Sequence, residues 1–486
     1  MTRRTTVADL VVDGLRRAGT PCLIGITGER AGLPILDAAR AIELPVTLAS
    51  TARGASIVAA VAGDLADAPG AAVIGDAATT GILDLPERLP VILITSGRPS
   101  VIAGAKEALR VEAESAAHRI AHAARLAMTG PRGAVHLDIP GDVAAGGALP
   151  LATSCRPDPL PYPTLDDLDR AARALSGATR PLLLVGSYSR SAEAAQWVRA
   201  FVEALPAPLL TTVRAKGVLP DPHPLMLGVL GAPGVDERLL GRADLVVAIG
   251  LDDLEPVPEA CRSAARTVVF GPAPAPDGLA PAAHVVGQVS AIVEELAGRL
   301  RDMPRADWDV AELDRLRREG AARSAGAPVE ARVVRLAREA TPAGTIASVD
   351  AGAYSACVAA SWSAVAPREF LAPSRPGASG FAMPAAVAAH LVHPDRRIVC
   401  FTSASDLSEE RELETAARLG APIVIVAFEA AADPSPALRQ AVRFDVPASA
   451  VDGEIAFAQA FGRALTIKGP SLVVVLSSSS ESSPTS

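Results

Sequence analysis

A short polar turn follows a buried strand in the last quarter of the sequence. Residues 397–402 are predicted to form an apolar strand, and Ser403, Ala404 and Ser405 follow it directly, with Asp406 next. In open parallel sheets ligands bind beyond the carboxyl ends of the strands, so this turn is a candidate site. Glycines there would let the backbone approach a phosphate, and a carboxylate would hold a divalent cation. The turn has no glycine, and Asp406 is its only candidate metal ligand.

Two histidines four residues apart offer a second possible chemistry. His118 and His122 fall on one face of a helix predicted at 114–127, as zinc ligands can. The sequence identifies no third ligand, so a surface or packed pair is the simpler interpretation. His136, in a predicted strand, is interpreted as structural. No nucleophile–base pair is recognisable, so no unrelated chemistry has support in the sequence.

The elements that would position these residues alternate between apolar strands and helices. Apolar runs of four to six residues between helical segments are typical of parallel sheets covered on both faces. We predict three α/β domains, each a mostly parallel sheet with helices on both faces, and a flexible serine-rich tail. The predicted boundaries are 1–156, 157–300 and 301–476 for the domains and 477–486 for the tail.

Composition excludes several classes of protein. The 486 residues carry a net charge of −8 spread along the chain and no basic patch, which argues against nucleic-acid binding. No run of 18 apolar residues exists, and the first 19 residues are typical of an amphipathic helix rather than a signal peptide. The charge-rich stretch 408–420 is interpreted as a solvated helix face. Five separated cysteines indicate reduced thiols in a cytoplasmic protein: Cys22, Cys155, Cys261, Cys357 and Cys400.

Several longer stretches resemble thiamine-diphosphate-dependent enzymes of the acetolactate synthase and benzoylformate decarboxylase group. They are "GPRGAVHLDIPGDV" at 130–143, the region 180–250, "SVDAG" at 348–352 and "GASGFAMPAAVAAHLVHPDRRIV" at 377–399. The resemblance implies a pyrimidine-binding, a central and a diphosphate-binding domain, with each active site shared by two subunits. It therefore implies a homodimer or a dimer of dimers, with an active paralogue as another possible partner.

The family's cofactor-activating glutamate corresponds to Ala55. Alanine cannot accept a hydrogen bond from the aminopyrimidine ring or move a proton. A shift in alignment does not restore the glutamate, because no carboxylate occurs between Glu43 and Asp64. Some family members work without this glutamate, so Ala55 alone does not decide the function.

The family's metal ligands are also replaced. Its Gly-Asp-Gly turn corresponds to Ser403-Ala404-Ser405, and its Asn-Asn pair after the next strand corresponds to Glu429 and Ala430. Mg²⁺ requires hard oxygen ligands in near-octahedral geometry, and neither alanine supplies one. Glu429 would add negative charge beside a diphosphate.

Other cofactor-contacting positions follow from the resemblance alone. Ser379 stands where a bulky apolar residue would hold the cofactor bent, and the loop at 74–81 departs from the family pattern. The remaining positions assigned to cofactor binding by resemblance are Asp350, Gly352, Gly380 and Met383.

Together these departures predict a non-catalytic or repurposed relative. It would be either a pseudoenzyme acting through assembly or a protein that binds another small ligand in the cleft where the family binds its cofactor. The alternative is an active thiamine-diphosphate-dependent 2-oxo acid decarboxylase or carboligase with an altered cofactor mode. Thiamine diphosphate and Mg²⁺ are implied by the family, but the replaced positions predict that they do not bind in the usual way. FAD is not expected, since the central domain has no G-x-G-x-x-G motif.

Overall fold

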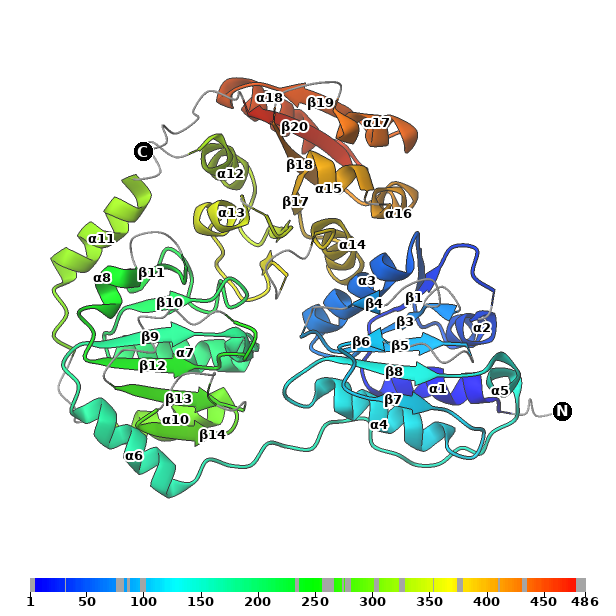
Figure 1. The fold of residues 1–486 in the computed structure, drawn as a ribbon, viewed down its shortest axis with the longest axis horizontal. Coiled ribbons are helices and arrows are strands. Elements are labelled where there is room, and N and C mark those ends of the chain that lie inside the picture. Colours follow the sequence, from blue (N-terminus) through cyan, green and yellow to red (C-terminus); the bar gives the residue numbers. More distant parts are fainter. Residues whose placement is uncertain are drawn as a thin grey trace. The chain divides into compact units, whose positions relative to one another are not determined.

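Three six-stranded parallel sheets form the framework of the protein (Figure 1). The fold comes from a computed structural model. It describes residues 5–30, 32–75, 83–84, 88–96, 102–231, 236–255, 266–272, 275, 281–300, 306–322, 328–352, 354–373, 379–409, 411–430 and 435–477. Within these residues no helix is long and apolar enough to cross a membrane.

The first sheet has the strand order β2-β1-β3-β5-β8-β7. Its strands are β2 (Val46–Ala49), β1 (Leu23–Ile26), β3 (Gly70–Val73), β5 (Val91–Thr95), β8 (Ala134–Asp138) and β7 (Ala108–Arg110). The helices of this block are α1 (Val7–Arg17), α2 (Leu33–Ala41), α3 (Ala52–Ala66), α4 (Ala116–Met128) and α5 (Gly141–Ala145). A separate short ladder joins β4 (Leu83–Asp84) to β6 (Ile102–Ala103).

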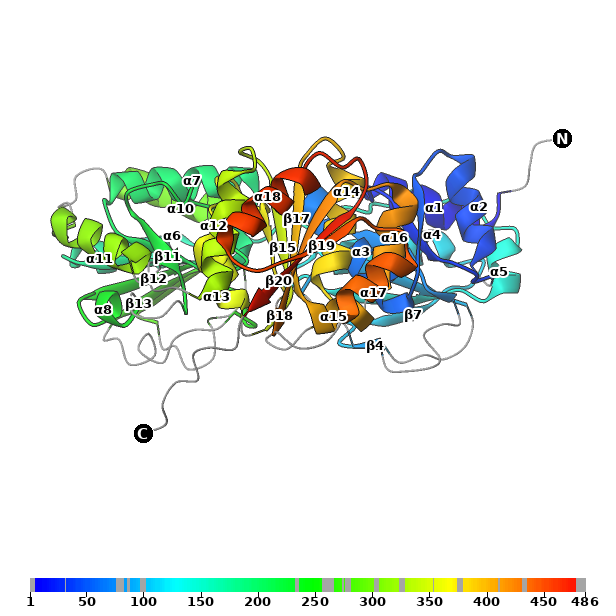
Figure 2. The ribbon, with the colours of Figure 1, turned by 90° about the horizontal axis from the view of Figure 1, so that it is seen from above.

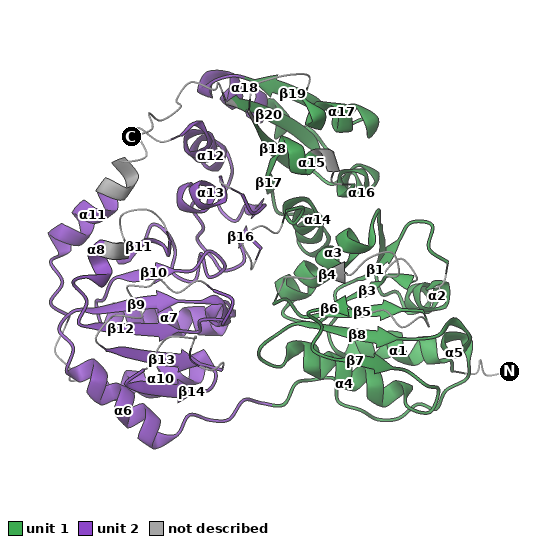
Figure 3. Cartoon of the chain, viewed as in Figure 1, with its two compact units in different colours: residues 1–158, 378–451, 463–486 green, residues 159–377, 452–462 purple. Residues whose placement is uncertain are grey.

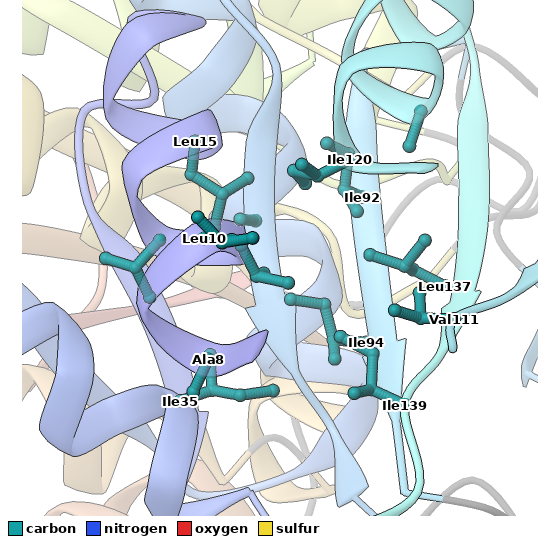
Figure 4. Close-up of a cluster of buried hydrophobic side chains, with 14 of the residues drawn as sticks. Ala8, Leu10, Leu15, Ile35, Ile92, Ile94, Val111, Ile120, Leu137 and Ile139 are labelled. Atoms are coloured by element: carbon teal, nitrogen blue, oxygen red, sulfur yellow. The ribbon is translucent and has the colours of Figure 1, made fainter. Parts of the chain in front are cut away.

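Helix α1 shows why this block folds as it does. Thr6 and Asp9 form a capping box, which satisfies backbone N–H groups at the start of the helix. The apolar face of α1 packs against α2, α4 and the sheet, in a core that includes Leu10, Leu15 and Ile92 (Figure 4). The predicted amphipathic helix is confirmed.

The middle sheet has the strand order β11-β10-β9-β12-β13-β14. Its strands are β11 (Met226–Val229), β10 (Leu209–Thr211), β9 (Pro181–Val185), β12 (Leu245–Ile249), β13 (Thr267–Gly271) and β14 (Ala283–Val286). The helical segments are α6 (Leu165–Ser176), η2 (Ser187–Ser189), α7 (Ala192–Ala204), α8 (Asp236–Leu240), α10 (Val289–Arg299) and α11 (Val310–Ala322).

Helices cover both faces of the middle sheet. Helices α7 and α10 pack side by side, and with α6 they bury one face of the sheet (Figure 2). The other face packs against α8 and α11 through residues such as Leu184, Leu240 and Trp308. Two apolar faces explain why the strands read as continuous apolar runs without polar alternation.

The third sheet has the strand order β16-β15-β17-β18-β20-β19. Its strands are β16 (Phe370–Leu371), β15 (Ile346–Val349), β17 (Ile398–Ser403), β18 (Ile423–Ala430), β20 (Ser471–Ser477) and β19 (Ala448–Val451). The helices are α12 (Val329–Glu339), α13 (Ser355–Ser361), α14 (Ala382–Val392), α15 (Ala404–Glu409), α16 (Glu412–Leu419), α17 (Pro436–Arg443) and α18 (Glu454–Ala464).

Contacts along the chain define two compact units (Figure 3). Unit 1 comprises Met1–Asp158, Ala378–Val451 and Arg463–Ser486, and unit 2 comprises Pro159–Gly377 and Asp452–Gly462. The predicted fold class of three parallel α/β sheets is confirmed, whereas the three domain boundaries stay a prediction. Strand β20 includes Ser477, the first residue of the predicted tail, and residues 478–486 lie outside the described residues.

Candidate functional site

The polar turn after β17 is the start of helix α15. The Ser403 hydroxyl accepts a hydrogen bond from the Asp406 backbone N–H at 3.0 Å, and it lies 2.7 Å from the Asp406 carboxylate, to which it donates. The Ser403 hydroxyl is therefore a side-chain cap for the start of this helix. Ala404 is the first residue of the helix and is only 2% exposed. The turn predicted as a candidate ligand site therefore has a local structural role.

The second predicted metal position lies inside a strand. Glu429 and Ala430 are the last residues of β18 and pair with Leu476 and Ser477 of β20. We expected both residues to follow the strand, and this expectation was wrong because β20 extends far enough to supply ladder partners for them. Within the described residues, no group of three or more His, Cys, Asp or Glu side chains could hold a metal ion.

The turn before α14 lies against the start of α3 within unit 1. The Arg53 guanidinium donates to the Ser379 carbonyl oxygen at 2.6 Å. Gly380 has φ of +71°, a conformation that favours glycine, and Met383 is buried in α14. The structure thus brings the predicted cofactor positions Ser379, Gly380 and Met383 close to the helix that contains Ala55.

Ala55 is fully buried in the first turns of α3, and the carboxylate that reaches this helix end belongs to Glu412. The Glu412 carboxylate accepts from the Ser50 and Thr51 backbone N–H groups at 3.2 and 3.0 Å. It also accepts from the Thr415 hydroxyl at 2.5 Å. A negative charge at this end is favoured by the helix dipole.

The position of the Glu412 carboxylate leaves room only for glycine at position 54. A Cβ at Gly54 would lie 2.1 Å from the Glu412 Oε1 atom. Glu412 is 0% exposed, so the prediction that the whole 408–420 stretch is a solvated helix face was wrong for this residue. Its backbone donors, Ser50 and Thr51, lie more than 360 residues away in sequence, which is why charge patterning alone did not identify it.

Glu29 was also missed by the sequence reasoning. It follows β1, and β1 and β3 are neighbours in the first sheet. Gly75 has φ of +51°, and a Cβ there would lie 2.5 Å from the Glu29 carboxyl carbon. An acidic residue three positions after an apolar strand was the available signal. In the third sheet, Asp350 occupies a similar place after β15 and is 2% exposed; Gly352 follows two residues later.

The histidines flagged in the sequence have ordinary environments. The Nε2 atom of His136, in the middle of β8, lies 2.7 Å from the Thr95 hydroxyl at the end of β5. Burial lowers the pKa of His136, and Asp138 opposes that shift. His122 is exposed and lies 3.2 Å from Glu107. These contacts are consistent with the structural interpretation.

The cysteines that the structure describes are free thiols. Cys22, Cys155 and Cys400 are buried and Cys357 is partly buried, whereas Cys261 lies outside the described residues. Burial raises the pKa of the Cys22 thiol to about 12, so this side chain is a poor nucleophile.

Comparisons with known proteins connect this geometry to a family. Residues 168–296 match "Thiamine pyrophosphate enzyme, central domain" and residues 350–432 match "Thiamine pyrophosphate enzyme, C-terminal TPP binding domain". The chain is 27% identical over 474 residues to the acetolactate synthase isozyme 1 large subunit of Escherichia coli, covering 88% of this chain and 82% of that protein. It is 31% identical over 307 residues to a probable 2-ketoarginine decarboxylase of Pseudomonas aeruginosa, covering 60% and 54% of the two chains.

A solved structure shares the fold. An X-ray structure of a proposed thiamin diphosphate-dependent enzyme from Mycobacterium smegmatis superimposes with a TM-score of 0.80 and 21% identity, covering 98% of this chain and all of that one. The match to a C-terminal TPP-binding domain implies thiamine diphosphate as the family's cofactor. The chain is thus similar to thiamine-diphosphate enzymes in its central and C-terminal regions, and to acetolactate synthase over most of its length.

Proposed function

We propose that this chain is a non-catalytic or repurposed relative of the acetolactate-synthase-like enzymes, in which the usual Mg²⁺-dependent cofactor site is not formed. The observation that carries this proposal is the capped helix start after β17. Ala404 offers a buried methyl group at the metal position. The Asp406 carboxylate accepts from the Ser403 hydroxyl, which itself accepts from the Asp406 backbone N–H.

The residues at this position do not fit Mg²⁺. The ion needs several oxygen ligands in near-octahedral geometry, of which a carboxylate is the anionic one. Recruiting Asp406 to a metal ion would break the hydrogen bond that its carboxylate accepts from the Ser403 hydroxyl, at a cost of about 1 kcal/mol. Ala55, fully buried in α3, has no group that could hydrogen-bond a pyrimidine ring. Positions on two different elements therefore support the same proposal.

The competing function is an active 2-oxo acid decarboxylase or carboligase. The alignment with acetolactate synthase over 474 residues and the match to a TPP-binding domain favour it. The two functions differ in one measurable property, which is metal-dependent affinity for thiamine diphosphate.

Calorimetric titration of the purified full-length chain with thiamine diphosphate, with and without Mg²⁺, tests the proposal. We expect no metal-dependent binding below a millimolar Kd. Sub-millimolar binding that requires Mg²⁺ would overturn the proposal and favour the enzyme.

A gain-of-function variant makes the test sharper. The double variant Ala404→Asp/Ala430→Asn restores the family's ligand types, and we expect at least a ten-fold gain in Mg²⁺-dependent cofactor affinity, about 1.4 kcal/mol. The matched control is Ser405→Asp/Ala430→Asn, which adds the same charge one residue away, on an exposed side chain. An equal gain in both variants would mean that added charge, and not ligand position, controls binding.

A further inference from the structure

The edge of the middle sheet between β9 and β12 has the topology of a ligand site. Strands β10 and β11 extend the sheet from β9 in one direction, and β13 and β14 extend it from β12 in the other. The chain adds β10 and β11 on one side of β9 and then returns to add β12, β13 and β14 on the other side. A switch point of this kind, here between β9 and β12, opens a crevice at the carboxyl ends of the strands. All six strands are parallel, so the segments after β9, β10 and β12 emerge at the same edge.

Glycines at this edge make room for a close contact. Gly186 follows β9, and a Cβ there would lie 2.5 Å from the Gly250 carbonyl oxygen and 2.6 Å from the Glu255 Oε2 atom. Gly250 follows β12 and has φ of +64°. The two strand ends therefore approach each other more closely than residues with side chains would allow.

The Glu255 carboxylate fills the space between these strand ends. Its Oε2 atom accepts from the Ser187 and Asp252 backbone N–H groups at 3.0 and 2.9 Å. Its Oε1 atom accepts from the Thr212 hydroxyl at 2.5 Å. The donors thus come from the segments after β9, β12 and β10, and Glu255 is 6% exposed.

This donor set is suited to anions in general. Backbone N–H groups that converge at strand ends, together with a hydroxyl, bind phosphate and carboxylate groups in the same manner. Two buried arginines, Arg190 and Arg214, occur in the segments after β9 and β10, and the buried Asp252 follows β12. The Asp252 carboxylate accepts from the Leu254 backbone N–H at 3.0 Å, so it stabilises the turn that carries Glu255.

We propose that this crevice is an anion-binding site whose resident anion is the Glu255 carboxylate of the chain itself. A second anion cannot share the three donors, because two buried like charges in contact repel each other strongly. Glu255 therefore excludes carboxylate and phosphate groups from the switch point of the middle sheet. Removing its side chain opens the site to a small anion from solution.

The test is rescue of Glu255→Ala by added anions, using the full-length chain. Melting temperature is measured in formate, in inorganic phosphate and in chloride at matched ionic strength. We expect formate or phosphate to raise the melting temperature of the variant in a saturable way, with at least ten-fold tighter apparent binding than in the wild type. Glu203→Ala is the matched control, because Glu203 is an exposed glutamate of the same unit.

Three results would overturn the proposal. The first is a folded Glu255→Ala variant that responds to formate and phosphate no more than Glu203→Ala does. The second is a wild-type chain that binds phosphate as tightly as the variant, because the resident carboxylate would then exclude nothing. The third applies if the variant is insoluble: refolding in formate or phosphate should raise its soluble yield relative to chloride, and no increase would refute an anion site.

Discussion

The carboxyl end of β17 and the β9–β12 edge of the middle sheet each hold an acidic side chain, but in different ways. At β17 the Asp406 carboxylate binds Ser403, three residues away, and the pair begins a helix. At the middle sheet the Glu255 carboxylate collects donors from Thr212 and Ser187, which are 43 and 68 residues away. The first contact stabilises one helix turn, whereas the second ties three strand ends together. A carboxylate at a strand end can therefore accept hydrogen bonds from its own helix turn or from distant segments, and we expect the second kind to contribute more to stability.

The largest expected effect is the loss of stability in Glu255→Ala. Three donors would lose their acceptor in a buried site, and we expect the free energy of unfolding to fall by about 3 kcal/mol in buffers with chloride as the only anion. Urea unfolding followed by circular dichroism measures this change. Glu203→Ala should change stability by less than about 0.5 kcal/mol, since its exposed ion pair with Arg199 contributes little. A loss below about 1 kcal/mol for Glu255→Ala would mean that the carboxylates at the two strand ends contribute equally to the free energy of unfolding.

A smaller effect is expected for Ser403→Ala. The variant removes the hydroxyl that caps α15, and an N-cap serine contributes about 1 kcal/mol. The control is Ser405→Ala, which shortens a more exposed side chain in the same turn and should cost about half as much or less. A cost for Ser403→Ala as large as that for Glu255→Ala would show that the β17 turn has more than a local role.

The smallest effect concerns pH and the end of β5, where the Thr95 hydroxyl contacts the buried His136 of β8. Burial lowers the pKa of His136 from its ordinary value of 6.5, while Asp138 opposes the shift. The folded state therefore takes up a proton less readily than the unfolded state. Stability should be complete above pH 6.5 and should fall as the pH decreases from 6.5 through the lowered folded-state value.

His136→Gln should reduce this pH dependence. Unfolding by urea at pH 7.5 and at pH 5.5 gives the two stabilities, and their difference should be smaller in the variant than in the wild type. The difference should not vanish, because burial also lowers the pKa of His223 and His390. An unchanged difference would mean that His136 does not contribute to the acid sensitivity of the fold.

Much of the fold could be predicted from the sequence because its signals are local. Apolar runs bounded by glycines predicted the strands, and the pattern after Thr6 predicted an amphipathic first helix. The side-chain cap at Ser403 also had a sequence signal, a serine followed three residues later by an acid. We interpreted that stretch through its resemblance to a metal turn, and the shorter-range explanation was overlooked.

The site could be predicted less well because its contacts join distant segments. Glu412 looked like part of a solvated charged face, yet its carboxylate lies at the N-terminus of α3. Glu29 and Glu255 gave no sequence signal beyond being acidic residues near strand ends. Glu429 and Ala430 looked like residues of a loop, and β20 makes them part of a strand.

The amino-acid sequence by itself determined the order of strands and helices, the parallel character of the sheets and the residue types at the family's cofactor positions. These follow from side-chain periodicity and from the chemistry of single residues. Only the tertiary structure decided which carboxylates are held by the chain's own donors, because Glu412 and Glu255 acquire their partners through segments that the fold brings together. A buried carboxylate is stable only when several donors converge on it, and convergence is a property of the packed chain.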